Sequence, residues 1–146
     1  MKSKLVAGVD GRSFVLVLDP GEEAFAAITK FAKAEALPGA SLTAIGAFER
    51  ATVGWFDIAK KEYRKIEIAE QCEALSLVGD VAIDDNGAPS LHLHAVLGLS
   101  DGSTRGGHLL DAIVQPTLEV MIRETPKALR RKKRPDLGLA LIDLSQ

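Results

Sequence analysis

The feature that most constrains this chain is a short run in which histidine alternates with apolar residues. Within residues 91–95, His92 and His94 stand two apart and their neighbours are leucine or alanine. Side chains at i and i+2 of a strand point to one face, so this pattern predicts a strand that presents both imidazoles on the same side. His108, the third and last histidine, follows a Gly-rich stretch. All three imidazoles therefore fall within one predicted hairpin.

The direction of His108 depends on how this hairpin turns. If residues 100–103 form the turn, simple antiparallel pairing sets His108 opposite Ala95, on the face away from the other histidines. A β-bulge would add one residue and reverse this parity, and Gly106 and Gly107 suit such a kink. We therefore expect either a bulge at these glycines or a ligand donated across a subunit boundary.

Together, His92, His94 and His108 form a candidate metal site. Three neutral imidazoles favour Zn²⁺ or a similar divalent transition metal over Mg²⁺ or Ca²⁺. Three protein ligands leave a position open for water or a small anion, as a catalytic or ligand-sensing zinc requires. Asp101 and Arg105 are candidates for the layer of residues around the ligands, or else they cap and flank the turn. The alternative is that His92 and His94 face solvent and His108 helps to close the turn.

The other patterns predict an α+β fold, with a mainly antiparallel sheet and one principal helix. Residues 13–18 are apolar and β-branched and predict a buried strand. We expect Asp19 to cap the helix that follows, and Pro38 with its neighbours to end it. After Gly39 the pattern has mostly the period of strands, with a strong turn signal at residues 84–87.

Three further expectations concern strand boundaries. A hairpin is predicted about residues 49–50, which would separate two short strands. Pro116 is predicted to break the strand that follows His108. Residues 138–144 are predicted to form a last strand that returns to the sheet.

Length and composition predict a single domain over residues 1–146, with its core at about 13–144. A chain of 146 residues is long enough for one hydrophobic core and short for two. The single cysteine, Cys72, excludes an internal disulfide, and we interpret it as structural. No segment approaches the length of apolar chain that spans a bilayer, so no membrane partner is expected. The simplest expectation is a cytoplasmic protein.

One dense basic run stands near the C-terminus. It supplies a candidate DNA-contacting patch of Arg130, Arg131, Lys132, Lys133 and Arg134. Such a patch could neutralise several phosphates and would give binding that weakens steeply with salt. The net charge of −2 supplies no general basic field to support it. The alternative, which we favour, is a solvated loop between two strands or an edge that its charge protects from aggregation.

Taken together, these motifs resemble the plant and prokaryote conserved (PPC) domain, also called the PD1-like DNA-binding domain. The resemblance covers about residues 13–144 and is close to the prokaryotic stand-alone form. Its specific part is the histidine strand with Asp101-Gly102 and residues 106–109. The turn at residues 18–23, residues 44–47 and the strand at 54–57 corroborate it.

This resemblance implies an α+β homotrimer in which His92, His94 and His108 match histidines that often hold a metal near a subunit boundary. In plants the domain accompanies AT-hooks that bind the minor groove, and this chain has none. We therefore predict a DNA-binding or regulatory protein with a three-histidine metal site. The alternative is a metal-dependent enzyme or small-molecule sensor that uses the open coordination position. A structural oligomer that carries a metal is a third possibility.

Overall fold

The structure is a computed structural model that describes residues 1–7 and 11–145. In this part of the chain it contains one helix and nine strands. The helix is α1 (Ala24–Ala34). The strands are β1 (Lys2–Ala7), β2 (Ser13–Leu18), β3 (Gly39–Asp57), β4 (Glu62–Ile68), β5 (Cys72–Ile83), β6 (Pro89–Gly98), β7 (Thr104–Glu124), β8 (Arg131–Arg134) and β9 (Leu139–Ile142). The predicted α+β class with an antiparallel sheet and one helix is confirmed.

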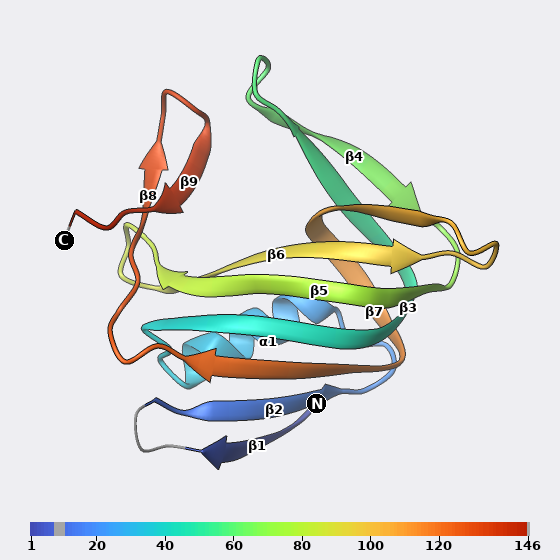
Figure 1. Cartoon of the computed structure of the whole chain (residues 1–146), viewed down its shortest axis with the longest axis horizontal. Coiled ribbons are helices and arrows are strands. Elements are labelled where there is room, and N and C mark those ends of the chain that lie inside the picture. Colours follow the sequence, from blue (N-terminus) through green and yellow to red (C-terminus); the bar gives the residue numbers. More distant parts are fainter. Residues whose placement is uncertain (8–10, 146) are drawn as a thin grey trace.

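Seven strands form the main sheet in the order β1-β2-β7-β6-β5-β3-β4, and β7 also pairs with β3. As a result β3, β5, β6 and β7 pair in a closed ring. Figure 1 shows these four strands as neighbours. Every pairing in this sheet is antiparallel. In this ring β6, which carries His92 and His94, pairs with β5. β7, which carries His108, pairs with β3.

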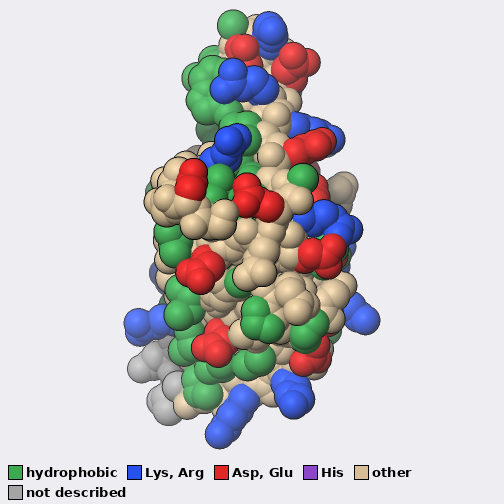
Figure 2. Space-filling model, turned by 90° about the vertical axis from the view of Figure 1, so that its right-hand side faces the viewer, with side chains coloured by type: hydrophobic (Ala, Val, Ile, Leu, Met, Phe, Trp, Pro, Cys, Tyr) green, Lys and Arg blue, Asp and Glu red, His purple; other side chains and the backbone are tan. Residues whose placement is uncertain are grey.

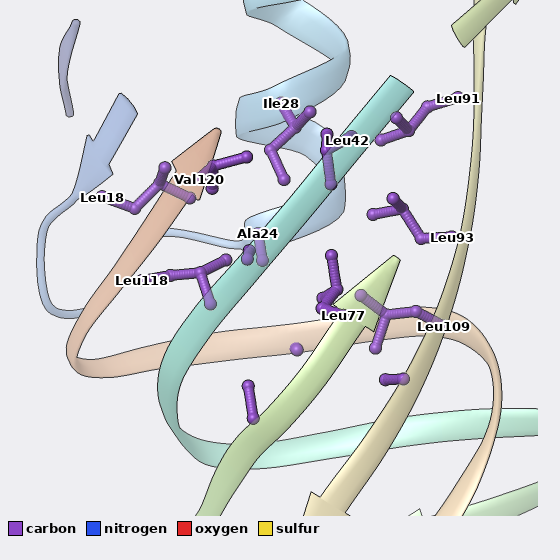
Figure 3. Close-up of a cluster of buried hydrophobic side chains, with 14 of the residues drawn as sticks. Leu18, Ala24, Ile28, Leu42, Leu77, Leu91, Leu93, Leu109, Leu118 and Val120 are labelled. Carbon is purple, nitrogen blue, oxygen red and sulfur yellow. The ribbon is translucent and has the colours of Figure 1, made fainter. Parts of the chain in front are cut away.

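Helix α1 lies across one face of the sheet, and the core fills the space between them (Figures 1 and 3). Apolar residues of the helix, such as Ile28, meet inward-facing residues of the strands, such as Leu42 and Leu118. Along β2 the burial alternates with period two, as the sequence predicted. The buried Leu91 and Leu93 anchor the histidine strand to this core.

The helix begins later than predicted, because its N-cap is Glu23 and not Asp19. The Glu23 carboxylate accepts hydrogen bonds from the backbone N–H groups of Phe25 and Ala26. Glu22 instead reaches back to the backbone N–H of Asp19 at 2.8 Å. The capping pattern seen in the sequence therefore closes a turn before the helix, and the first free helical N–H groups are satisfied one turn further on.

Two of the three expectations about strand boundaries are wrong, and the third is right only in that a last strand forms at Leu139–Ile142. β3 runs without a turn through residues 49–50, and β7 runs through Pro116. Each long strand bends and changes partners along its length, so β7 pairs first with β6, then with one half of β3 and then with the other. β9 does not return to the main sheet, because it pairs with β8 in a separate two-stranded sheet. Local patterns mark bends but do not distinguish them from turns.

No helix in the described part of the chain combines the length and apolar character needed to cross a membrane.

Candidate metal centre

The hairpin between β6 and β7 sets the direction of His108. The backbone N–H of Leu99 donates to the carbonyl of Ser103 at 2.9 Å, so the loop between them contains three residues and not the predicted four. Gly102 takes a positive φ of 80° in this loop, which a side chain would resist. The shorter loop shifts the register by one residue, and His108 pairs directly with His94.

The predicted bulge at Gly106 and Gly107 is therefore wrong, since these residues pair regularly with β6. Crowding between backbones explains both glycines. A Cβ atom at Gly107 would lie 2.6 Å from the carbonyl oxygen of Gly54 on β3, and one at Gly106 would lie 2.8 Å from that of Ala95. The glycines allow β7 to pass between β3 and β6, which holds His108 beside its partners.

The three imidazoles converge. Each offers a nitrogen that lies within 4.8 Å of those of the other two, and the Nε2 atoms of His92 and His94 are 3.1 Å apart. Two nitrogens bound to one tetrahedral Zn²⁺ at about 2.0–2.1 Å would lie about 3.3 Å from each other. The distance between the Nε2 atoms of His92 and His94 therefore fits a shared ion of this size. All three donors come from one chain.

Burial favours the neutral, metal-binding form of two of these histidines, His94 and His108. The pKa of His108 falls to about 4, mainly because of burial and also because of the neighbouring His92, His94 and Arg131. Burial also lowers the pKa of His94, with a smaller contribution from His92. The Nδ1 atom of His108 is buried without a hydrogen-bond partner among the described residues. Three imidazoles close together, one with an unsatisfied nitrogen, are a donor set suited to a transition metal.

Asp80 is a neighbour of the cluster that the sequence analysis missed. It lies on β5 directly opposite His92 in the strand pairing, and its Oδ2 is 3.7 Å from His92 Nδ1. Burial opposes ionisation of Asp80, but His92 and Arg131 together lower its pKa below the usual value. The sequence predicts the turn at residues 84–87. The exact length of this turn decides whether residue 80 or a neighbour pairs with His92. A one-residue uncertainty in register hid this carboxylate.

The candidates Asp101 and Arg105 lie at the end of the hairpin. The Asp101 carboxylate accepts hydrogen bonds from the backbone N–H and the hydroxyl of Ser103, so it closes the loop. Ser103 also lowers the pKa of Asp101, with a smaller contribution from Arg105. Arg105 pairs with Leu97 and lies an odd number of positions from His108, on the other side of β7. The structure gives neither side chain a contact with the histidines.

A pocket of about 570 Å³ opens in front of the cluster. One wall comes from the β3–β4 arm, with Trp55, Phe56 and Tyr63, and the other from residues 138–141 of the β8–β9 hairpin. Figure 1 shows these two arms rising from the same side of the sheet. Near their tips the Lys61 ammonium donates to the carbonyl of Pro135 at 3.2 Å. Tyr63 stacks on the His108 ring, with centroids 4.9 Å apart.

The basic run does not form one free patch. Arg131 is only 5% exposed and binds Asp80. Lys132 pairs with Asp143 and Arg134 with Asp136, each at 2.8 Å. Within the described residues, only Arg130 and Lys133 of the five have no ion pair. Charges of both signs are also interspersed over the face of the molecule seen in Figure 2.

The fold and this site define a class of α+β protein whose antiparallel sheet carries a three-histidine cluster at the base of a pocket. The chain belongs to the Plants and Prokaryotes Conserved (PCC) domain family, whose sequence model matches residues 6–126. The resemblance inferred from the histidine hairpin is thus confirmed. The β8–β9 hairpin lies beyond the matched residues.

Solved structures of similar proteins extend over nearly the whole chain. A metal-containing protein from Archaeoglobus fulgidus is 36% identical, with 98% of this chain and 99% of that one covered and a TM-score of 0.83. A PPC protein from Pyrococcus horikoshii is 32% identical, with 99% and 96% covered and a TM-score of 0.85. A "putative DNA binding protein" from Bacteroides thetaiotaomicron is 28% identical, with 99% of each chain covered and a TM-score of 0.89.

Among curated proteins, the chain is 27% identical over 135 residues to a bifunctional protein GlmU from Synechococcus sp.. This match takes in 91% of the present chain, which spans about one fifth (20%) of the length of that relative.

Proposed function

We propose that this protein binds a divalent transition metal, with Zn²⁺ as the first candidate, through His92, His94 and His108. The convergence of three imidazoles on one point carries this proposal. The metal-containing protein of Archaeoglobus fulgidus, at 36% identity, supports it. A metal held by three protein ligands can acidify a bound water or polarise a carbonyl at its open position.

The pocket favours a small-molecule sensor or enzyme as the use of this site. A volume of about 570 Å³ lies in the range of small-molecule sites. Its walls are mainly apolar and aromatic, with Trp55 exposed toward solvent. Arg131 and Asp80 neutralise each other beside the cluster, so a bound divalent cation would leave net positive charge there. A small organic anion with an apolar body is the ligand class that fits both properties.

The residues around the pocket position such a ligand and limit access of water. Tyr63 packs against His108 and covers one side of that ring. Burial raises the pKa of Tyr63, so its hydroxyl keeps its proton at neutral pH and can donate a hydrogen bond. Trp55 and Leu141 face the pocket from opposite arms and offer apolar surface to the ligand body.

A homotrimer is the assembly we propose, and an exposed apolar sheet face supports it. Val15, Met121, Thr43, Val78 and His94 pair successively across five strands and form one lateral row. Met121 and Val78 are 51% and 48% exposed, although the row lies in the middle of the sheet. Apolar groups in such a position mark an interaction surface. Because His94 belongs to this row, a subunit contact there would lie beside the metal site.

DNA binding is a second candidate function, supported by the name of the Bacteroides thetaiotaomicron relative. The ion pairs within the basic run leave little free positive charge for phosphates. A regulatory protein that binds DNA would therefore need another surface, or several subunits together.

The first test is titration of the metal-free protein with Co²⁺, which reports tetrahedral coordination through its visible absorption. We expect one Co²⁺ per chain, and an altered spectrum when phenylacetate is added, but a weaker response to acetate, which lacks the apolar body. The exposed Glu67→Ala on β4 serves as a control and should match the unaltered protein. Absence of bound Co²⁺ would refute the metal proposal, and equal responses to both anions would refute the ligand class.

A further inference from the structure

The orientation of the His92 ring separates its two nitrogens by role. Nε2 faces Nε2 of His94 inside the cluster, at 3.1 Å. Nδ1 lies on the opposite side of the ring and faces Asp80 Oδ2 at 3.7 Å. A carboxylate beside the outer nitrogen of a metal-bound histidine fixes its tautomer and its orientation, and strengthens it as a ligand. Asp80 is in the correct place for this role.

The Arg131 guanidinium holds the Asp80 carboxylate in place. One Nη atom of the guanidinium binds Asp80 Oδ1, and the other donates to the backbone carbonyl of Ser90 at 3.1 Å. Ser90 lies two residues before His92 on β6, whereas Asp80 is on β5. The buried Arg131 side chain thus joins β5 and β6 next to His92. Because Arg131 is paired with Asp80, it cannot act as a free cation.

The position of Arg131 in the chain adds to this argument. It begins β8, which lies after the residues that the family model matches. The β8–β9 hairpin also supplies a wall of the pocket, through residues 138–141. Ile83 at the end of β5 forms a bridge with Arg130, and its backbone N–H donates to the carbonyl of Leu129. The segment is therefore tied to the end of β5, three residues from Asp80.

We propose that Asp80 is a positioning residue for His92, and that Arg131 holds Asp80 in place, so that the C-terminal hairpin is a working part of the metal centre. This inference rests on the proposed metal-binding function. A purely structural ion pair would stabilise the hairpin but leave metal affinity unchanged. The two roles therefore make different predictions.

The variant Asp80→Asn distinguishes a positioning role from a purely structural role, with Asp143→Asn as the matched control. Asp143 also pairs with a cation of β8, Lys132, but the structure gives it no contact with a histidine. We expect Asp80→Asn to weaken Co²⁺ binding by about 10- to 100-fold, the usual effect of losing such a partner. Asp143→Asn should bind Co²⁺ as the unaltered protein does, and Asp80→Glu should restore part of the affinity. Unchanged affinity in Asp80→Asn would overturn the proposal.

The link to Arg131 is tested by combining variants. Arg131→Met should weaken Co²⁺ binding, and the double variant with Asp80→Asn should be no weaker than Asp80→Asn alone, because both changes act through one carboxylate. Fully additive losses would refute the link. Circular dichroism and thermal unfolding of the metal-free variants show whether each one folds.

A measurement on the unaltered protein decides the case even if the variants do not fold. In the Zn²⁺-loaded protein, ¹⁵N NMR of the imidazoles is expected to show His92 protonated at Nδ1 and bound to metal through Nε2. Coordination through His92 Nδ1 would overturn the role of Asp80. If the unaltered protein binds neither Co²⁺ nor Zn²⁺, the proposed function itself fails, and this outcome is distinct from the others.

Discussion

The histidine cluster and the basic run are both concentrations of one residue type in the sequence, but the structure treats them in opposite ways. The histidines stand on two neighbouring strands of the main sheet, and pairing brings their rings together. The basic residues lie on a short strand outside the main sheet, where successive side chains point to opposite sides and meet different carboxylates. Clustering in sequence therefore becomes a site only where the register makes side chains converge.

The largest expected effect is on the cluster. His94→Ala should abolish stoichiometric metal binding, because two remaining imidazoles leave a divalent ion with too few protein ligands. The His94 side chain is exposed, so the fold should remain. Elemental analysis of the purified variant, with circular dichroism as the check on folding, tests this expectation. Full retention of zinc would contradict the metal assignment.

Within the basic run, the effects on stability should differ sharply. Arg131→Met should lower the free energy of unfolding by about 3 kcal/mol, since it leaves Asp80 partly buried without its cation. Arg134→Met removes an exposed pair with Asp136 and should cost less than about 1 kcal/mol. Urea unfolding of both variants gives the comparison. Similar losses would show that the two pairs are equivalent.

The stability of the metal-free protein should depend on pH through His108, a member of the histidine cluster. Folding lowers the pKa of His108 from 6.5 to about 4, so the folded state favours the neutral ring. The stability from this preference is complete above pH 6.5 and is lost as pH falls toward about 4. Thermal unfolding should decline over this range, and less so in His108→Gln. An identical decline in the variant would assign the effect to other groups.

The smallest effect is expected for DNA. Only Arg130 and Lys133 of the basic run remain without an ion pair among the described residues, so this run should neutralise at most about two phosphates per chain. The logarithm of the binding constant should then fall with the logarithm of salt concentration with a slope near −2 per chain, whereas all five cations would give about −4.5. Fluorescence anisotropy with a labelled duplex measures this slope. A value near −4.5 would show that the ion pairs open on binding.

Much of the fold could be predicted because the signals are local. The alternation in β2 and β6 reports which side chains face the core, and the turn before β6 follows from Asn86-Gly87. The boundaries of β3 and β7 could not be predicted in this way. A bend within a strand and a turn between strands use similar residues, and only the partners of the strand distinguish them.

The sequence by itself determined that His92 and His94 share a face, since a strand has a period of two residues. It also placed His108 close to them along the hairpin. The tertiary structure alone decided that His108 shares a face with the other two histidines, because a change of one residue in loop length reverses the face to which each side chain points. It alone brought Asp80 and Arg131 to the cluster, since they are distant in the chain and meet only through the pairing of β5 with β6 and the return of β8.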